Sequence, residues 1–136
     1  MVILIAEDHP IVAMMLAWQL ADEGHRVLRP VSTLHDAETL AREECPDLAL
    51  IDIGLGDNED GVSLARVLQS ELQIPCVFIT GALAAARANT DAALGVIAKP
   101  YSLSDLNRSI RALNMILLGV TPQAAEVPAA LELFSQ

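Results

Sequence analysis

The sequence has few of the features that mark exported, membrane-spanning or metal-thiolate proteins. Its apolar runs fall far short of the roughly 20 residues that a membrane span needs. The N-terminus has neither a basic start nor a small-residue cleavage site, so we expect no signal peptide and a cytoplasmic location. The two cysteines, Cys45 and Cys76, are too far apart for a metal-type spacing, and we expect both to be reduced packing residues.

Basic residues are also scarce, which argues against one class of partner. The net charge is −10, and residues 1–60 hold thirteen acids but only three bases, whereas residues 61–136 hold five of each. Proteins bind nucleic acids through Lys and Arg side chains that neutralise phosphates, so direct nucleic-acid binding is not expected. A cation or a basic protein partner suits the acidic first half better. The single lysine is Lys99.

The sequence does contain an alternation of short apolar runs with helical patterns. Five runs are predicted as strands, over residues 2–6, 26–31, 48–52, 76–80 and 95–98. Helices are predicted over residues 11–20, 35–44, 62–72, a short and weakly anchored stretch within 82–93, and 103–119. For the last helix the predicted core stripe is Leu103, Leu106, Ile110, Leu113 and Leu117. This order predicts an α/β fold with a doubly wound parallel sheet and helices on both faces.

We predict one domain over residues 1–118 and a C-terminal tail over residues 119–136. The tail contains two prolines and an apolar end with Leu131, Leu133 and Phe134. Three arrangements remain open: a flexible tail, packing on the body of the domain, or pairing in a homodimer. In either ordered arrangement, these three apolar residues are expected to anchor the tail.

Acidic, hydroxyl and amino side chains follow four of the predicted strands. Glu7 and Asp8 end the first, Asp52 the third and Thr80 the fourth, and Lys99 follows the fifth. The carboxyl ends of parallel strands meet at one sheet edge, so these side chains should gather there. Crowded carboxylates repel one another, and Mg²⁺, which prefers oxygen ligands, would relieve that repulsion. A carboxylate could then attack phosphorus, with the hydroxyl and ammonium groups binding the phosphoryl oxygens.

Four motifs, in this order, resemble the response-regulator receiver family. They are Ile-Ala-Glu-Asp at 5–8, Leu-Ile-Asp-Ile at 50–53, Phe-Ile-Thr-Gly at 78–81 and Ala-Lys-Pro-Tyr at 98–101. The resemblance covers about residues 1–118 and implies a CheY-like five-stranded sheet in the order 2-1-3-4-5. It also implies a cis peptide at Lys99-Pro100.

The resemblance implies a role for each matching residue. Asp52 would be the phosphoacceptor, Thr80 and Lys99 would hold phosphoryl oxygens, and Mg²⁺ would be bound by Glu7, Asp8, Asp52 and the backbone carbonyl of Gly54. The phosphoryl donor would be a histidine kinase or a histidine phosphotransfer protein. We therefore expect a signalling protein rather than a metabolic enzyme. It would have no output domain of its own and would act on a downstream protein.

Within the family, residues 78–81 and 55–61 resemble single-domain regulators with a Phe-Ala-Thr-Gly motif, although Ile79 and Leu83 differ from that pattern. Val96 stands where many receivers carry an aromatic residue that swings inward on activation, so that readout cannot operate here. The spacing between Thr80 and Lys99 is short, which predicts a trimmed fourth helix. Order and disorder of the Ala-rich segment is the expected replacement for the aromatic switch.

Several alternatives stay open at this point. Ile11, Met14 and Trp18 share one stripe of the first helix, which could be core or a docking face for the phosphodonor. His9 adjoins the acidic pair but is expected to be a surface or capping residue. Rival functions are a phosphate sink for a kinase, a phosphorylation-independent binding module, and a small metal-dependent phosphatase, for which the sequence offers no separate acid or base.

Overall fold

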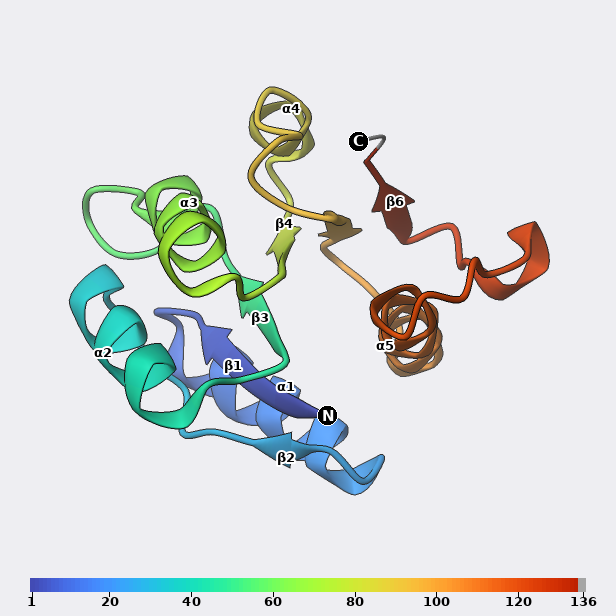
Figure 1. Ribbon diagram of the computed structural model, residues 1–136, viewed down its shortest axis with the longest axis horizontal. Coiled ribbons are helices and arrows are strands. Elements are labelled where there is room, and N and C mark those ends of the chain that lie inside the picture. The colour runs from blue at the N-terminus through green and yellow to red at the C-terminus, as the bar shows by residue number, and fades with distance from the viewer. Residues whose placement is uncertain (135–136) are drawn as a thin grey trace.

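The structure is a computed structural model of the chain and describes residues 1–134. Six strands form one sheet in the order β2-β1-β3-β4-β5-β6 (Figure 1). The strands are β1 (Val2–Ala6), β2 (Arg26–Val27), β3 (Leu48–Ile51), β4 (Cys76–Thr80), β5 (Gly95–Ala98) and β6 (Leu131–Leu133). The helices are α1 (Pro10–Asp22), α2 (Leu34–Glu44), α3 (Gly61–Leu72), α4 (Leu83–Arg87) and α5 (Leu103–Leu117), followed by the short 3-10 turn η1 (Ala124–Glu126).

The first five strands are parallel and in the order that the family resemblance implied, which confirms the predicted fold class. Their bounds differ little from the predicted ones, except that β2 is only two residues long. Val31, predicted to end that strand, instead forms an isolated bridge with Ala6. Among residues 1–134, no helix is both long and apolar enough to span a membrane.

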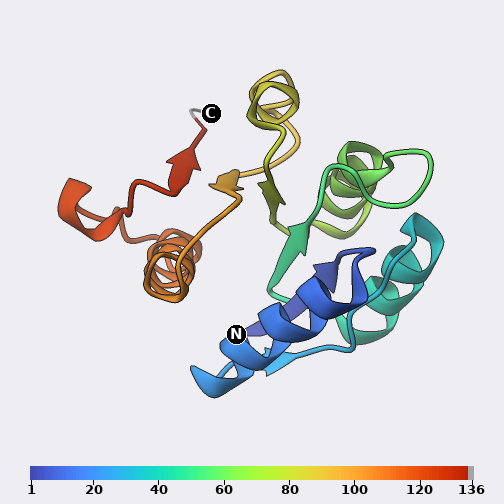
Figure 2. The same ribbon diagram turned by 180° about the vertical axis from the view of Figure 1, so that it is seen from behind.

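Helices cover both faces of the sheet (Figures 1 and 2). Each face has its own hydrophobic core. One core packs against α2, α3 and α4, and the other packs against α1 and α5. Successive residues of a strand point to opposite faces, so Leu4 of β1 enters the first core while Ile3 and Ile5 enter the second. All three side chains are fully buried. Strands buried on both faces explain why the apolar runs are continuous rather than alternating.

Two helix starts are fixed by hydroxyl side chains that accept hydrogen bonds from the first helical turn. Thr33 Oγ1 accepts from the backbone N–H of Asp36 at 3.1 Å, so Thr33 is the cap of α2. Ser102 Oγ accepts from the backbone N–H of Asp105 at 3.0 Å and caps α5 in the same way. These caps define where α2 and α5 begin.

The predicted core stripe of α5 is wrong at one position. Leu106, Ile110 and Leu113 are buried as predicted, but the side chain of Leu103 is 51% exposed. Leu103 is the first residue of the helix, at the end where the chain enters it. Helical periodicity places it on the stripe, but it lies ahead of the buried residues that meet the sheet.

Helix α1 departs further from expectation. The interpretation of Ile11, Met14 and Trp18 as core residues is wrong, because their side chains are 69%, 45% and 65% exposed. The face toward the sheet is made by the buried residues Ala13, Leu16 and Leu20. The large apolar side chains of this helix are therefore a surface feature.

The end of the tail adds a strand that the sequence analysis did not predict. β6 pairs antiparallel with β5, with Leu131 opposite Ile97 and Leu133 opposite Gly95. Leu131 is buried in the core beneath α1 and α5, and Phe134 packs against the opposite core. Of the three open arrangements, the described residues show packing on the body of the domain. The last two residues of the predicted tail, 135–136, lie outside the described range.

Candidate functional site

The five side chains singled out at strand ends lie at one edge of the sheet. Glu7 and Asp8 follow β1, Asp52 follows β3, Thr80 ends β4 and Lys99 follows β5. One oxygen from each of the three carboxylates lies within 4.8 Å of the others. The parallel register of β1, β3 and β4 brings residues that are far apart in sequence to the same level.

Lys99 makes its shortest ion pair with Glu7. Lys99 Nζ lies 2.7 Å from Glu7 Oε1 and 3.8 Å from Asp52 Oδ2. The other carboxylate oxygen of Glu7 accepts from the backbone N–H of Asp8 at 2.9 Å. Burial raises the pKa of Glu7, but hydrogen bonds with Lys99 and Asp52 and the Lys99 charge lower it below its ordinary value. Glu7 therefore stays ionised and holds the ammonium group beside Asp52.

Asp52 is the carboxylate whose ionisation the site opposes. Burial, the adjoining Glu7 carboxylate and its negative charge raise the pKa of Asp52, and the Lys99 charge offsets only part of that rise. Its Oδ1 accepts from the backbone N–H of Gly54 at 3.1 Å, which leaves Oδ2 on the side of Lys99. A cation added near Asp52 would favour the ionised, nucleophilic form.

Asp8 presents an oxygen that the protein leaves unsatisfied. Asp8 Oδ2 accepts from the backbone N–H of Gly56 at 3.2 Å, but the buried Oδ1 accepts no hydrogen bond from any residue of the described range. His9 Nδ1 lies 3.4 Å away without forming one. An orphaned carboxylate oxygen in a cluster of acids is the donor chemistry that a hard divalent cation requires. The carboxylates present thus fit Mg²⁺. The interaction that the structure shows for Gly54 is the hydrogen bond from its N–H to Asp52 Oδ1.

His9 is the fourth member of this cluster, although from the sequence it is expected to be only a surface or capping residue. Its imidazole is 73% exposed, as expected for a surface residue. The sequence analysis missed Gly61 as a positioning residue. A Cβ at Gly61 would collide with the backbone oxygens of Asp52 and Ile53, so only glycine lets α3 begin directly against the strand end that carries Asp52. No signal in the sequence distinguished it from the other loop glycines.

Thr80 is buried at the end of β4, and its hydroxyl is already engaged. Thr80 Oγ1 accepts from the backbone N–H of Ala82 at 3.0 Å, immediately before α4. The backbone carbonyl of Thr80 accepts from the N–H of Lys99 at 3.0 Å, which ties the two strand ends together. The Lys99-Pro100 peptide is cis, as the resemblance implied.

Comparison with known proteins decides the family. A family model for the response regulator receiver domain matches residues 3–111. The chain belongs to the response regulator receiver family. The receiver is 32% identical over 107 residues to the transcriptional regulatory protein PdtaR of Mycobacterium tuberculosis, in a match covering 76% of this chain and 52% of PdtaR. It is 29% identical over 130 residues to the virulence transcriptional regulatory protein PhoP of Salmonella typhimurium, covering 93% and 57%. The chain thus spans about half the length of these curated relatives.

Solved receiver structures agree with this assignment. The signal receiver domain of a modulated diguanylate cyclase from Desulfovibrio desulfuricans G20 is 34% identical, with a TM-score of 0.71 over 81% of this chain and 90% of that one. A CheY-like receiver domain protein from Methanospirillum hungatei JF-1 has a TM-score of 0.77, covering 87% and 96%, and at 24% identity it shows the fold alone. Response regulator receivers are signalling proteins, which agrees with the expected class of function.

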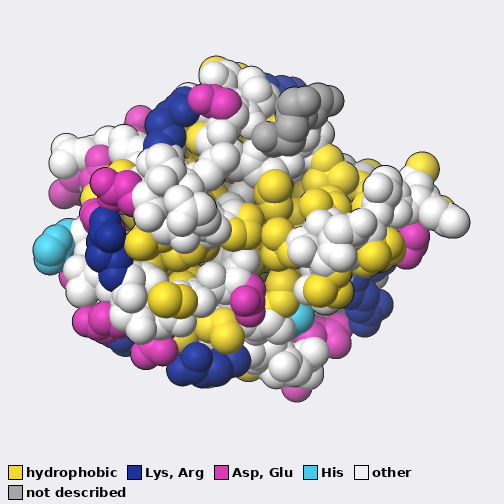
Figure 3. Space-filling view, in the orientation of Figure 1, with side chains coloured by type: hydrophobic (Ala, Val, Ile, Leu, Met, Phe, Trp, Pro, Cys, Tyr) yellow, Lys and Arg dark blue, Asp and Glu magenta, His cyan; other side chains and the backbone are white. Residues whose placement is uncertain are grey.

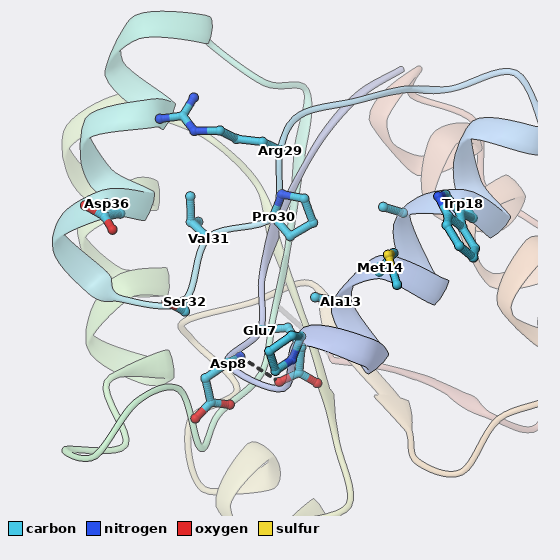
Figure 4. A pocket seen from close by; sticks show the side chains of 12 residues that line it. Glu7, Asp8, Ala13, Met14, Trp18, Arg29, Pro30, Val31, Ser32 and Asp36 are labelled. Atoms are coloured by element: carbon cyan, nitrogen blue, oxygen red, sulfur yellow. Dashed lines mark hydrogen bonds between the residues drawn. The ribbon is translucent and has the colours of Figure 1, made fainter.

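Helix α1 of this receiver stands between two surface hollows that both reach the site. A groove of about 700 Å³ lies between α1 and the segment before α2, lined by Met14 and Trp18 on one side and Pro30 on the other. Figure 4 shows it running toward Glu7 and Asp8. On the other side of α1, a hollow of about 430 Å³ is lined by Val12, Met15, Gln19, Lys99, Pro100 and Tyr101. The exposed apolar face of α1 is therefore continuous with the acidic site.

Proposed function

We propose that this receiver takes a phosphoryl group onto Asp52 from a phosphohistidine, in a reaction that depends on Mg²⁺. The donor is a histidine kinase or a histidine phosphotransfer protein. The observation that carries the proposal is the grouping of Asp52 with Lys99, at 3.8 Å, and with the carboxylates of Glu7 and Asp8 at an open sheet edge. Membership of the receiver family supports the same reaction.

In this reaction Asp52 Oδ2 is the attacking atom. It donates an electron pair to phosphorus, the P–N bond to the donor's histidine breaks, and the ring nitrogen keeps the bonding pair and takes a proton from water. Lys99 turns from Glu7 toward a phosphoryl oxygen, and the Thr80 hydroxyl donates to another. Hydrolysis reverses the role of Asp52, since water attacks phosphorus and the carboxylate leaves.

The proposed metal ligands are Glu7, Asp8, Asp52 and the backbone carbonyl of Gly54. Mg²⁺ bound there would supply positive charge against the carboxylates and the phosphoryl oxygens. Its support is the unsatisfied Oδ1 of Asp8 together with the raised pKa of Asp52, because both carry a cost that a cation removes. Glu7 is already paired with Lys99. Until the Lys99 ammonium group moves away, Glu7 would contribute to the site mainly by holding that group in place.

We further propose that the phosphodonor docks on α1. Five large apolar side chains of this helix are exposed, namely Ile11, Val12, Met14, Met15 and Trp18. Among the residues described, an exposed apolar set of this kind beside a catalytic edge indicates a protein-binding face. The acidic residues at the end of the groove favour a partner with basic side chains around an apolar surface. The output passes through a downstream protein by further contacts.

Intact mass measured after incubation with a small phosphodonor tests the proposal. The wild type should gain one phosphoryl group with Mg²⁺ and none with a chelator, and Asp52→Asn should gain none. Asp57→Asn is the matched control, because Asp57 is an exposed acid of the same loop region and should leave the gain intact. Equal gain by Asp52→Asn would contradict the assignment of the phosphoacceptor.

Docking is tested separately with a protein donor, identified by profiling the histidine kinases of the same organism. Trp18→Ala should slow transfer from that donor by roughly tenfold or more, since aromatic residues dominate interfaces, while phosphorylation by the small donor stays unchanged. Leu118→Ala removes an equally exposed apolar residue at the end of α5 and should change neither rate. Unaltered transfer to Trp18→Ala would refute docking on this side of α1.

A further inference from the structure

Strand β6 is bound to the domain by backbone pairing and by one side-chain clamp. The N–H of Phe134 donates to the carbonyl of Leu94 at 2.8 Å, and the N–H of Ala98 donates to the carbonyl of Ala130 at 2.9 Å. Arg87, at the end of α4, also binds Glu132. Its Nε and Nη2 donate to the carboxylate oxygens of Glu132 at 2.7–3.1 Å. The strand therefore bridges β5 and α4.

The sequence of β5 is fitted to this strand. A Cβ at Gly95 would collide with the carbonyl oxygen of Glu132, so the close approach of β6 depends on glycine at this position. Figure 3 shows hydrophobic side chains gathered around β6 and between β6 and α5. Leu117, Val127 and Leu133 are partly buried and pack against the core that α1 and α5 cover. Arg108 of α5 adds a hydrogen bond to the carbonyl of Ala125 at 2.9 Å. The domain thus has a surface that is complementary to the tail.

The Arg87–Glu132 ion pair is connected to the site through the short helix α4. Helix α4 has five residues, buries only Ala86, and has no side-chain cap at its start. The hydrogen bond from the N–H of Ala82 to Thr80 Oγ1 is the link between this start and the site. At the other end of the same helix, Arg87 holds Glu132. A short element with so little buried surface can shift at low cost in free energy.

We propose that β6 is the readout of phosphorylation in this protein, and this inference rests on the proposed function. When the Thr80 hydroxyl turns to donate to a phosphoryl oxygen on Asp52, it leaves the N–H of Ala82. Helix α4 then shifts, Arg87 releases Glu132, and β6 separates from β5 more often. Val96 pairs with Glu132 and is too small to signal by swinging its side chain. In this proposal, strand β6, which lies opposite Val96, moves instead.

The coupling must also act in the opposite direction. If phosphorylation loosens β6, a loosened β6 must favour binding of the phosphoryl group by the same factor, because linkage between two equilibria is reciprocal. Beryllofluoride with Mg²⁺ mimics the phosphoryl group without covalent chemistry, so its dissociation constant measures this effect at equilibrium. Gly95→Ala and Glu132→Gln loosen the strand from its two contacts, and neither residue is part of the site.

The experiment uses the full chain and follows amide exchange by NMR, with intact mass recorded on the same sample. Phosphorylation should speed exchange at the N–H of Phe134 by about fivefold or more, the lower range of allosteric couplings. Beryllofluoride should bind Gly95→Ala and Glu132→Gln more tightly by a similar factor. Arg42→Gln breaks a comparable guanidinium–carboxylate cluster between α2 and α3 and should behave as the wild type.

Three outcomes are distinguishable. A gain in mass with faster exchange at Phe134, and tighter beryllofluoride binding by both variants, supports the readout. A gain in mass with unchanged or slower exchange overturns the readout and leaves phosphorylation of Asp52 intact. No gain in mass overturns the proposed function and the readout together. Should Gly95→Ala not fold, Glu132→Gln carries the same test, because surface ion pairs add little to stability.

Discussion

Helices α3 and α4 cover the same face of the sheet, yet they are attached to it very differently. Helix α3 has twelve residues and buries Leu64, Ala65 and Leu68, whereas α4 has five residues and buries only Ala86. Each follows a site residue, since α3 starts after the loop from Asp52 and α4 starts just beyond Thr80. The difference indicates that Asp52, the proposed phosphoacceptor, lies on a fixed part of the fold, whereas Thr80 lies beside a part that can move.

The largest expected effect comes from loosening the fixed side. Leu68→Ala removes a fully buried side chain of α3 and should lower the free energy of unfolding by about 2–5 kcal/mol, from lost burial and the cavity left behind. Urea denaturation of the wild type and the variant measures this. A loss under about 1 kcal/mol would show that α3 is not the anchor described here.

A smaller effect of opposite sign is expected at Asp52. Because its folded pKa is raised, the stability it contributes is present below the ordinary carboxyl pKa, about 4, and is lost as pH rises through its folded value. Asp52→Asn should therefore raise Tm at pH 7 by roughly 2–5 °C, the shift that about 1 kcal/mol gives in a domain of this size.

Thermal melts in chelator from pH 4 to 7 check this prediction. The difference in Tm between Asp52→Asn and the wild type should widen as pH rises. The lowered pKa of Glu7 acts in the other sense, giving stability that is lost on acidification, so the wild type and Asp52→Asn are compared with each other at every pH. A Tm of Asp52→Asn below that of the wild type at pH 7 would contradict the described electrostatics.

The smallest stability change is expected on the movable side. Leu83 is the one large apolar side chain in α4 and is only partly buried, so Leu83→Ala should cost about 0.5–1.5 kcal/mol. Urea denaturation run beside Leu68→Ala gives the direct contrast. Equal losses from the two substitutions would remove the distinction between a fixed and a movable helix.

Cys76 provides a chemical test of the fixed side of this contrast, with Cys45 as an exposed reference thiol. Burial raises the pKa of Cys76 to about 12, beneath α3 on β4, whereas Cys45 is exposed at the end of α2. A thiol reagent should label Cys45 rapidly and Cys76 only when the domain opens. Rapid labelling of Cys76 in the native protein, read by mass, would mean that the region under α3 opens locally.

The strand order and the grouping of the site residues could be predicted because both follow from rules that act along the sequence. Apolar runs ending in Glu7, Asp52 and Thr80 put those side chains at one edge of a parallel sheet, whatever the details of packing. The partner of Lys99 could not be predicted, since Glu7 lies far away in sequence and both carboxylates are within reach of the amine. The sequence likewise gave no sign of the unsatisfied oxygen of Asp8.

Two parts of the fold could not be predicted from the sequence, for other reasons. Helix α1 has large apolar side chains on nearly every side, so periodicity could not tell which of them face the sheet, and the small Ala13 turned out to lie inward. Strand β6 is three residues long and exists through its pairing with β5, so no local pattern marks it. The glycine that admits it, Gly95, looks like any strand-end glycine until the neighbouring backbone is known.

Mapping the phosphorylated residue tests the central claim most directly. Borohydride reduces an aspartyl phosphate to homoserine, so treatment after phosphorylation, followed by peptide sequencing, marks the acceptor. The account predicts homoserine at position 52 only, and only when Mg²⁺ was present. Modification at another carboxylate, or a stable phosphate on His9 with Asp52 unchanged, would contradict it.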